Sequence, residues 1–190
     1  MAVFYLLFSH IVADFLLQPS RLVRYKEKNL RGVFLHVLVH FAVALVFLLP
    51  YLHDAQTIGA IVIVCLLHGV IDIGKIRLQK KTKLFLYPFL LDQTLHFLAI
   101  FTTVFISKIY AVLPAFGNEF FMRAIYMNVP LVTFLTLLIF TNVIYDLAFF
   151  QILRENHPTH RPAFPVKNYI SRTLTALILW AAYLMIAALV

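Results

Sequence analysis

Six long apolar segments follow one another along the chain, and short polar stretches separate them. They cover residues 2–18, 33–51, 57–75, 86–107, 129–150 and 169–190. Each is about 17 to 22 residues long, which is the length that an α-helix needs to cross a bilayer. The pattern therefore predicts an all-α polytopic bundle of six transmembrane helices, which forms a single transmembrane domain over residues 1–190.

Composition supports a membrane protein and argues against a soluble domain. Hydrophobic residues make up 63% of the chain and charged residues 13%, whereas soluble domains are nearer half apolar and a quarter charged. The net charge of +8 does not indicate nucleic acid, because membrane proteins carry an excess of Lys and Arg in their cytoplasmic loops. We therefore expect membrane lipids, and no nucleic acid, as partners.

The basic residues of the connecting segments predict the orientation of the helices. They concentrate in the first, third and fifth loops, whereas the second loop has no Lys or Arg. These odd-numbered loops are expected on the cytoplasmic side, which places both termini outside. The residues are Arg21, Arg24, Lys26, Lys28 and Arg31, then Arg77, Lys80, Lys81 and Lys83, then Arg154, Arg161 and Lys167.

Ionisable and polar residues inside the apolar segments come in pairs that are four positions apart. This spacing places both side chains of a pair on one face of a helix. Ionisable groups are costly in lipid, so each pair needs partners or a function. The pairs are His10/Asp14, His36/His40, His68/Asp72, Asp92/His96 and Asn142/Asp146.

The depth of these pairs predicts one shared site in the cytoplasmic leaflet. At about 1.5 Å per residue, one member of each pair lies roughly 5 Å inside the cytoplasmic end and the other roughly 11 Å inside. The order is His-then-Asp in the first and third segments and Asp-then-His in the fourth, which runs in the opposite direction. The shallow members are Asp14, His36, Asp72, Asp92 and Asp146, and the deep members are His10, His40, His68, His96 and Asn142.

The same pairs indicate an internal repeat. His10 and His68 are 58 residues apart, and His36 and Asp92 are 56 residues apart. Because the offset spans two segments, it predicts a parallel repeat of helical hairpins.

Imidazoles beneath carboxylates are typical of a transition-metal site, in which carboxylates complete or orient the ligand set. We predict one or two divalent ions, with zinc preferred and manganese or iron as alternatives. The predicted metal ligands are His10, Asp14, His40, His68, Asp72, Asp92 and His96. His36 and Asp146 are predicted as catalytic residues, either as further ligands or as a general base. Gln18, Lys75 and Gln93 are predicted to bind substrate.

Other uses of this polar layer stay open from the residues alone. Buried His and Asp residues also occur in proton relays and transport pathways. Haem ligation by His40 and a facing His is a further alternative, and so is a purely structural polar layer that specifies helix packing.

Four motifs carry a resemblance to a known family. They are Ser-His-Ile-Val-Ala-Asp-Phe-Leu-Leu-Gln at 9–18, His36-x-x-x-His40, His68-Gly-Val-Ile-Asp72-x-x-Lys75 and Asp92-Gln93-x-x-His96. They resemble a bacterial integral membrane family of unknown function, domain of unknown function 3307. The resemblance covers about the first hundred residues, implies the bacterial cytoplasmic (inner) membrane and supplies no activity. The His/Asp pattern is also loosely similar to membrane-bound metal-dependent hydrolases.

Two functional hypotheses follow from the sequence. The first is a metal-dependent hydrolase or group-transfer enzyme that acts on a lipid or lipid-linked phosphate, or on a phosphorylated small molecule, at the cytoplasmic leaflet. The second is a transporter of protons, metal ions or small solutes that uses the buried His/Asp cluster. Few polar residues are expected in the outer leaflet, which favours the enzyme.

Overall fold

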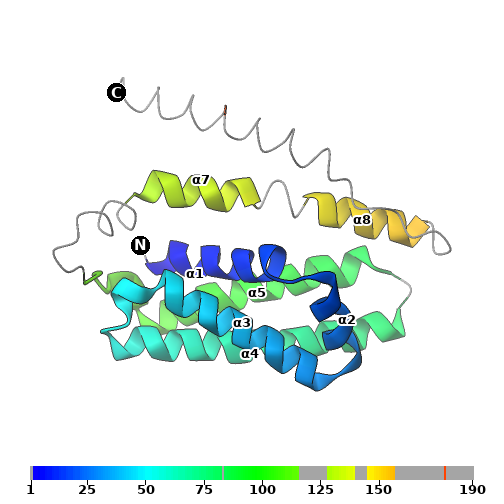
Figure 1. The fold of residues 1–190 in the computed structure, drawn as a ribbon, viewed down its shortest axis with the longest axis horizontal. Coiled ribbons are helices and arrows are strands. Elements are labelled where there is room, and N and C mark those ends of the chain that lie inside the picture. Colours follow the sequence, from blue (N-terminus) through cyan, green and yellow to red (C-terminus); the bar gives the residue numbers. More distant parts are fainter. Residues whose placement is uncertain (1, 83, 116–127, 140–144, 157–177, 179–190) are drawn as a thin grey trace.

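The computed structural model describes residues 2–82, 84–115, 128–139, 145–156 and 178, and every regular element in these ranges is a helix (Figure 1). This confirms the all-α class for the described part of the chain. The elements are α1 (Ala2–Ile11), η1 (Val12–Leu16), α2 (Ser20–Lys28), α3 (Leu30–Phe47), η2 (Leu49–Tyr51), α4 (Ala55–Lys81), α5 (Leu86–Ser107), η3 (Ile109–Ala111), α7 (Val129–Ile139) and α8 (Tyr145–Asn156).

Three of the described helices, α3, α4 and α5, are long and apolar enough to cross a membrane. A fourth span is added if α1, η1 and the sharply bent α2 count as one broken segment. The outward faces of the long helices are apolar and exposed, as at Phe34, Leu66 and Phe105, which is what lipid contact requires. The predicted sixth segment (169–190) lies outside the described residues apart from residue 178, so the count of six stays a prediction.

The helix boundaries follow the apolar pattern closely in some places and depart from it in others. α5 begins and ends where the pattern places it, at 86 and 107, whereas α4 continues six residues past the predicted end to Lys81. The predicted fifth segment (129–150) contains α7 and the start of α8, and residues 140–144 between them lie outside the described ranges.

Residues 19–32, which the apolar pattern assigns to a loop, contain the additional helix α2. The prediction of a loop was wrong here because hydropathy detects only helices that are apolar overall, and α2 is strongly charged. Its inner face is formed by Leu22 and Lys26, which are buried and one turn apart, while Arg21 and Arg24 are exposed.

The chain bends sharply between η1 and α2, and α2 packs against the start of α3. The axis turns by 94° between Ala2–Leu16 and Arg21–Lys28. A Cβ atom on Gly32 would lie 2.5 Å from the backbone nitrogen of Lys26 and 2.5 Å from the carbonyl carbon of Tyr25. Only glycine permits such an approach, so Gly32 fixes where α2, and with it Lys26, can lie.

α1, α3, α4 and α5 pack together, with α7 against α1 and α8 against α5 (Figure 1). The half of this bundle that lies away from α2 has an apolar core. Its largest fully buried side chains include Leu6, Leu48, Tyr51, Ile61 and Ile100.

Polar side chains fix the starts of several helices. Asp54 caps α4 by accepting from the backbone N–H of Thr57 at 2.9 Å, and Asn29 caps α3 by accepting from that of Arg31 at 2.9 Å. At the start of α5, Oε2 of Glu155 on α8 accepts from the backbone N–H of Leu86 at 3.1 Å. These contacts satisfy N–H groups that have no partner within their own helix, and they set which residues face inward.

Candidate metal centre

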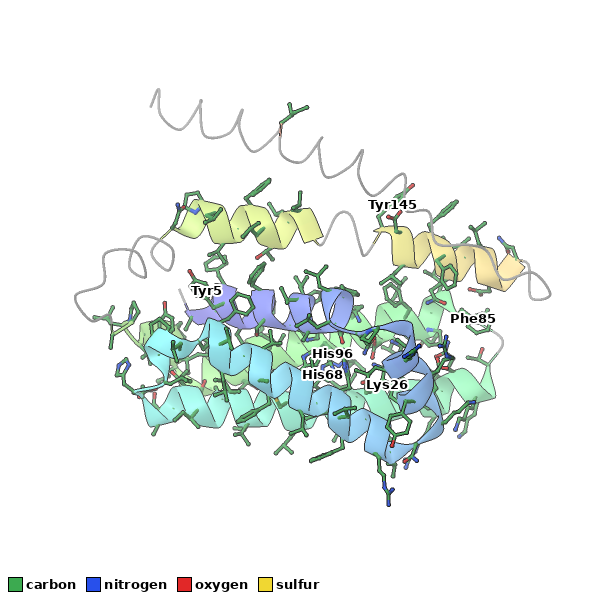
Figure 2. All side chains as sticks on the ribbon, viewed as in Figure 1. Tyr5, Lys26, His68, Phe85, His96 and Tyr145 are labelled. Carbon is green, nitrogen blue, oxygen red and sulfur yellow. The ribbon has the colours of Figure 1, made fainter. Side chains whose placement is uncertain are left out.

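Four imidazoles from four helices lie together in the interior of the bundle: His10 on α1, His40 on α3, His68 on α4 and His96 on α5 (Figure 2). The ring centroids of His40 and His68 are 3.7 Å apart, those of His68 and His96 are 4.2 Å apart, and those of His10 and His96 are 5.0 Å apart. The predicted convergence of the deep imidazoles is therefore confirmed in the geometry.

Asp14 is the carboxylate that lies nearest to most of these rings. It lies in η1, a π-helical turn, and such turns are rare and frequent at functional sites. Its Oδ1 lies 3.1 Å from Nε2 of His40, 3.0 Å from Nε2 of His36 and 3.8 Å from Nε2 of His68. From within this π-turn, one carboxylate lies close to histidines on two other helices, α3 and α4.

His10, Asp14, His40 and His68 form a compact set of potential ligands. Each offers one ligand atom, and these atoms all lie within 4.8 Å of one another at buried positions. Three imidazole nitrogens and one carboxylate oxygen are a donor set that suits tetrahedral zinc.

The hydrogen bonding of these imidazoles fits a cation ligand. Nε2 of His10 and both ring nitrogens of His68 are buried and have no hydrogen-bond partner among the described residues. Burying polar atoms without partners is unfavourable, and a metal ion bound to Nε2 of His10 and to one ring nitrogen of His68 would reduce that cost. The residues present therefore fit a divalent metal.

Two further embedded carboxylates, those of Asp72 and Asp92, are paired with lysines. Nζ of Lys26, on α2, donates to both carboxylate oxygens of Asp72, at 3.1 and 2.8 Å. Nζ of Lys75 donates to Oδ2 of Asp92 at 2.6 Å. Both aspartates were predicted as metal ligands, and their roles stay predictions.

Lys26 is the residue at this site that the sequence did not single out. It lies in a segment with four other basic residues, and the positive-inside rule explains a basic residue at any of these positions. This rule therefore gives no reason to separate Lys26 from the others. In the structure Lys26 is only 6% exposed, whereas Lys28 on the same helix is exposed. Its helical spacing from the apolar Leu22 was the one available signal.

His36 and Gln18 hold Asp14 in place. Nε2 of His36 lies 3.0 Å from Oδ1 of Asp14, and the amide nitrogen of Gln18 lies 2.8 Å from Nε2 and 3.1 Å from Nδ1 of the same ring. Gln18 was predicted to bind substrate, and the structure places its amide against the His36 ring. A group that orients a metal-binding side chain in this way tunes the affinity for the metal.

Two further predicted residues lie on or near α5. Nε2 of Gln93 donates to Oδ2 of Asp92 at 3.0 Å. Asp146 is fully buried in the first turn of α8, which packs against α5, and among the described residues it belongs to none of the ligand groups. Asn142, its predicted partner, lies outside the described residues, as do His157 and His160.

A family model described as "Protein of unknown function (DUF3307)" matches residues 2–122. The chain belongs to this family. The DUF3307 match spans α1 through α5 and so contains all of the clustered histidines and their aspartates except Asp146. No curated protein and no solved structure matches the chain.

Proposed function

We propose that this protein is a membrane metalloenzyme that hydrolyses, or transfers a group from, a lipid or lipid-linked phosphate. The observation that carries the proposal is the set of His10, Asp14, His40 and His68. Ligand atoms from three separate helical segments lie within 4.8 Å of one another in a buried position, and three of the histidine nitrogens there have no hydrogen-bond partner among the described residues.

Zinc is the proposed ion because three imidazoles and one carboxylate match its preferred donors, with manganese and iron as alternatives. When bound, such an ion would act as a Lewis acid toward a phosphoryl oxygen and activate water as the nucleophile. His36 acts here as a positioning residue, since it holds Asp14. Asp146 is the proposed general base, because it is a buried carboxylate on α8, which lies against α5.

The phosphate part of the proposal rests on the basic end of the bundle. Exposed basic side chains of α2 and α4 lie there: Arg21, Arg24, Lys28, Arg77, Lys80 and Lys81. Such a rim attracts phosphate head groups and anionic lipid. By the positive-inside rule this end faces the cytoplasm of a bacterial inner membrane, in a six-helix arrangement with both termini outside.

Transport is the second candidate function. The two lysine–aspartate pairs beside the imidazoles favour it, because chains of ionisable residues line proton and ion pathways. The apolar packing of the other half of the bundle, around Leu6, Ile61 and Ile100, favours the enzyme. A one-sided polar site suits chemistry at one leaflet better than passage through the membrane.

One reconstitution experiment separates the two functions. The zinc-loaded protein is placed in vesicles of phosphatidylethanolamine and phosphatidylglycerol that contain phosphatidic acid, and head-group or phosphate release is measured beside proton and zinc flux. We expect zinc-dependent release that falls by about 100-fold or more in Asp14→Asn, since loss of even an outer-shell partner costs about 10- to 100-fold. Glu27→Gln, at an exposed position of α2, should leave the release unchanged. Coupled flux without turnover of any of these lipids would favour the transporter.

A further inference from the structure

A second group of potential cation ligands lies beside the first and shares no residue with it. Asp72, Asp92 and His96 each offer one ligand atom, and these atoms lie within 4.8 Å of one another at buried positions. Oδ1 of Asp92, Oε1 of Gln93 and both ring nitrogens of His96 have no hydrogen-bond partner among the described residues. A set of two carboxylates and one imidazole, in which Asp92 and His96 have acceptor atoms without partners among the described residues, suits a second cation.

The carboxylates of this second group already face two cations that belong to the protein. The ammonium of Lys26 donates to both oxygens of Asp72, at 3.1 and 2.8 Å, and that of Lys75 donates to Oδ2 of Asp92 at 2.6 Å. The Lys26 side chain is 6% exposed and that of Lys75 is 22% exposed. Lys26 is therefore the more deeply buried of the two lysines, and its ammonium donates to both carboxylate oxygens of Asp72, whereas Lys75 donates to one oxygen of Asp92.

The charges decide how many metal ions this arrangement accepts. Asp14, Asp72 and Asp92 carry three negative charges, and the two ammonium groups balance two of them. One divalent ion would leave an excess of one positive charge, whereas a second ion would leave an excess of three. Excess charge in a buried, low-dielectric site is unfavourable, so a second ion is disfavoured while both lysines are present. Removal of the Lys26 ammonium lowers the two-ion excess from three to two and also frees the two Asp72 oxygens to which it donates.

Lys26 reaches this position only because of how α2 is attached. The helix follows the sharp turn after η1, and the absence of a side chain on Gly32 lets the backbone of Tyr25 and Lys26 lie directly against α3. Lys28, two positions later on the same helix, is exposed. The bend before α2 and its close contact with α3 therefore determine that Lys26 is the lysine of α2 that contacts Asp72.

The geometry points to Lys26 as an internal cation that fills the second metal position, so that the native centre holds one divalent ion. Removal of the ammonium frees both oxygens of Asp72 and opens the group of Asp72, Asp92 and His96 to a second divalent ion. This inference rests on the proposed metal centre at His10, Asp14, His40 and His68, and it adds the stoichiometry of that centre and the residue that sets it.

The test is a count of zinc ions per chain. The full-length protein is purified in detergent, stripped with a chelator, reloaded with excess zinc and dialysed, and zinc is measured by elemental analysis. We expect about one zinc ion per wild-type chain and about two per Lys26→Met chain, the number found in paired-metal sites. Lys28→Met, which removes an exposed lysine from the same helix, should keep the wild-type value, and so should Lys26→Arg, which keeps the charge.

The outcomes separate this inference from the metal centre itself. Equal zinc content in Lys26→Met and the wild type, or two tightly bound ions in the wild type, would overturn the role of Lys26 and leave the first centre standing. Absence of zinc from the wild type and from every variant would overturn the proposed function as well. If Lys26→Met is not monodisperse on size exclusion, Lys26→Gln takes its place, and the wild-type titration alone can still contradict the inference.

Discussion

At the scale of single residues, the character of the site depends on how Asp14 is held. Its carboxylate faces His36 and His40 at hydrogen-bond distance, and the Gln18 amide contacts the His36 ring. Asp14 is thereby fixed beside His10 and His68, and Nε2 of His10 and both ring nitrogens of His68 have no hydrogen-bond partner among the described residues. We interpret Gln18 and His36 as outer groups that orient a ligand and leave the inner nitrogens available to a cation.

Gln18→Leu tests this chain of contacts. The substitution removes the amide that donates to His36, so His36 and Asp14 lose their fixed orientation, and we expect zinc affinity to weaken by about tenfold. Competition with a coloured chelator measures the affinity. Gln79→Leu, at a position of α4 outside the ligand groups, is the control. Unchanged affinity in Gln18→Leu would contradict a positioning role.

Helical periodicity predicted the members of the cluster but not their pairing. The i, i+4 spacing is enough to place His10 with Asp14 or His68 with Asp72 on one face, because that follows from helix geometry alone. The contact of Asp72 with Lys26, or of Asp14 with His36, depends on how the helices are rotated against one another. The spacing of residues along a single helix carries no information on that rotation.

At the scale of elements, the π-turn η1 and the short helix α2 distinguish this bundle from a simple set of hairpins. Asp14, in η1, lies at hydrogen-bond distance from histidines of α3, and α2 lies against the bundle so that Lys26 contacts Asp72 of α4. Neither element follows from the apolar pattern, because a π-turn leaves hydropathy unchanged and α2 is too polar to count as a membrane segment. Local helix propensity and Gly32 are the sequence features on which α2 depends.

Gly32→Ala tests the placement of α2. A methyl group there would meet backbone atoms of Tyr25 and Lys26 at 2.5 to 2.7 Å, and backbone cannot move aside as a flexible side chain can. We expect the free energy of unfolding to fall by about 1–3 kcal/mol, as for other overpacked sites. Thermal unfolding in detergent measures this change.

Gly59→Ala is the matched control, since a Cβ at Gly59 meets no atom within 4 Å. In the interior of α4 alanine is favoured over glycine by about 0.5–1 kcal/mol, so this variant should be as stable as the wild type or slightly more so. Equal stability of the Gly32 and Gly59 variants would show that α2 does not need its close contact with α3.

At the scale of the whole molecule, polarity is divided between the two ends of the bundle. His68 and His96 lie near the middle of the bundle (Figure 2), the basic rim of α2 and α4 lies toward one end, and the other end is packed with apolar side chains. The sequence predicted this division from the depth of the polar pairs and the loop charges. The number of spans follows less directly, because three described helices meet the criteria for a span and a fourth is bent.

Cysteine labelling tests which end faces the cytoplasm. In a Cys65→Ala background, Gln56→Cys lies at the start of α4 and Lys28→Cys lies on α2, both at exposed positions. The positive-inside rule predicts that a membrane-impermeant maleimide labels residue 56 in intact cells and residue 28 only after lysis. The reverse pattern would place the site on the outer face and remove the argument for a cytoplasmic substrate.

The measurement that tests the central claim most directly is the zinc content of the reloaded wild-type protein beside His68→Ala and His53→Ala. His68 belongs to the proposed ligand set, whereas His53 is an exposed histidine just before the start of α4. We expect the wild type and His53→Ala to retain zinc through a mild chelator wash, and His68→Ala to bind it at least about 100-fold more weakly. Equal zinc content in folded wild-type and His68→Ala protein, or no zinc in any of the three, would contradict a metal centre built on these histidines.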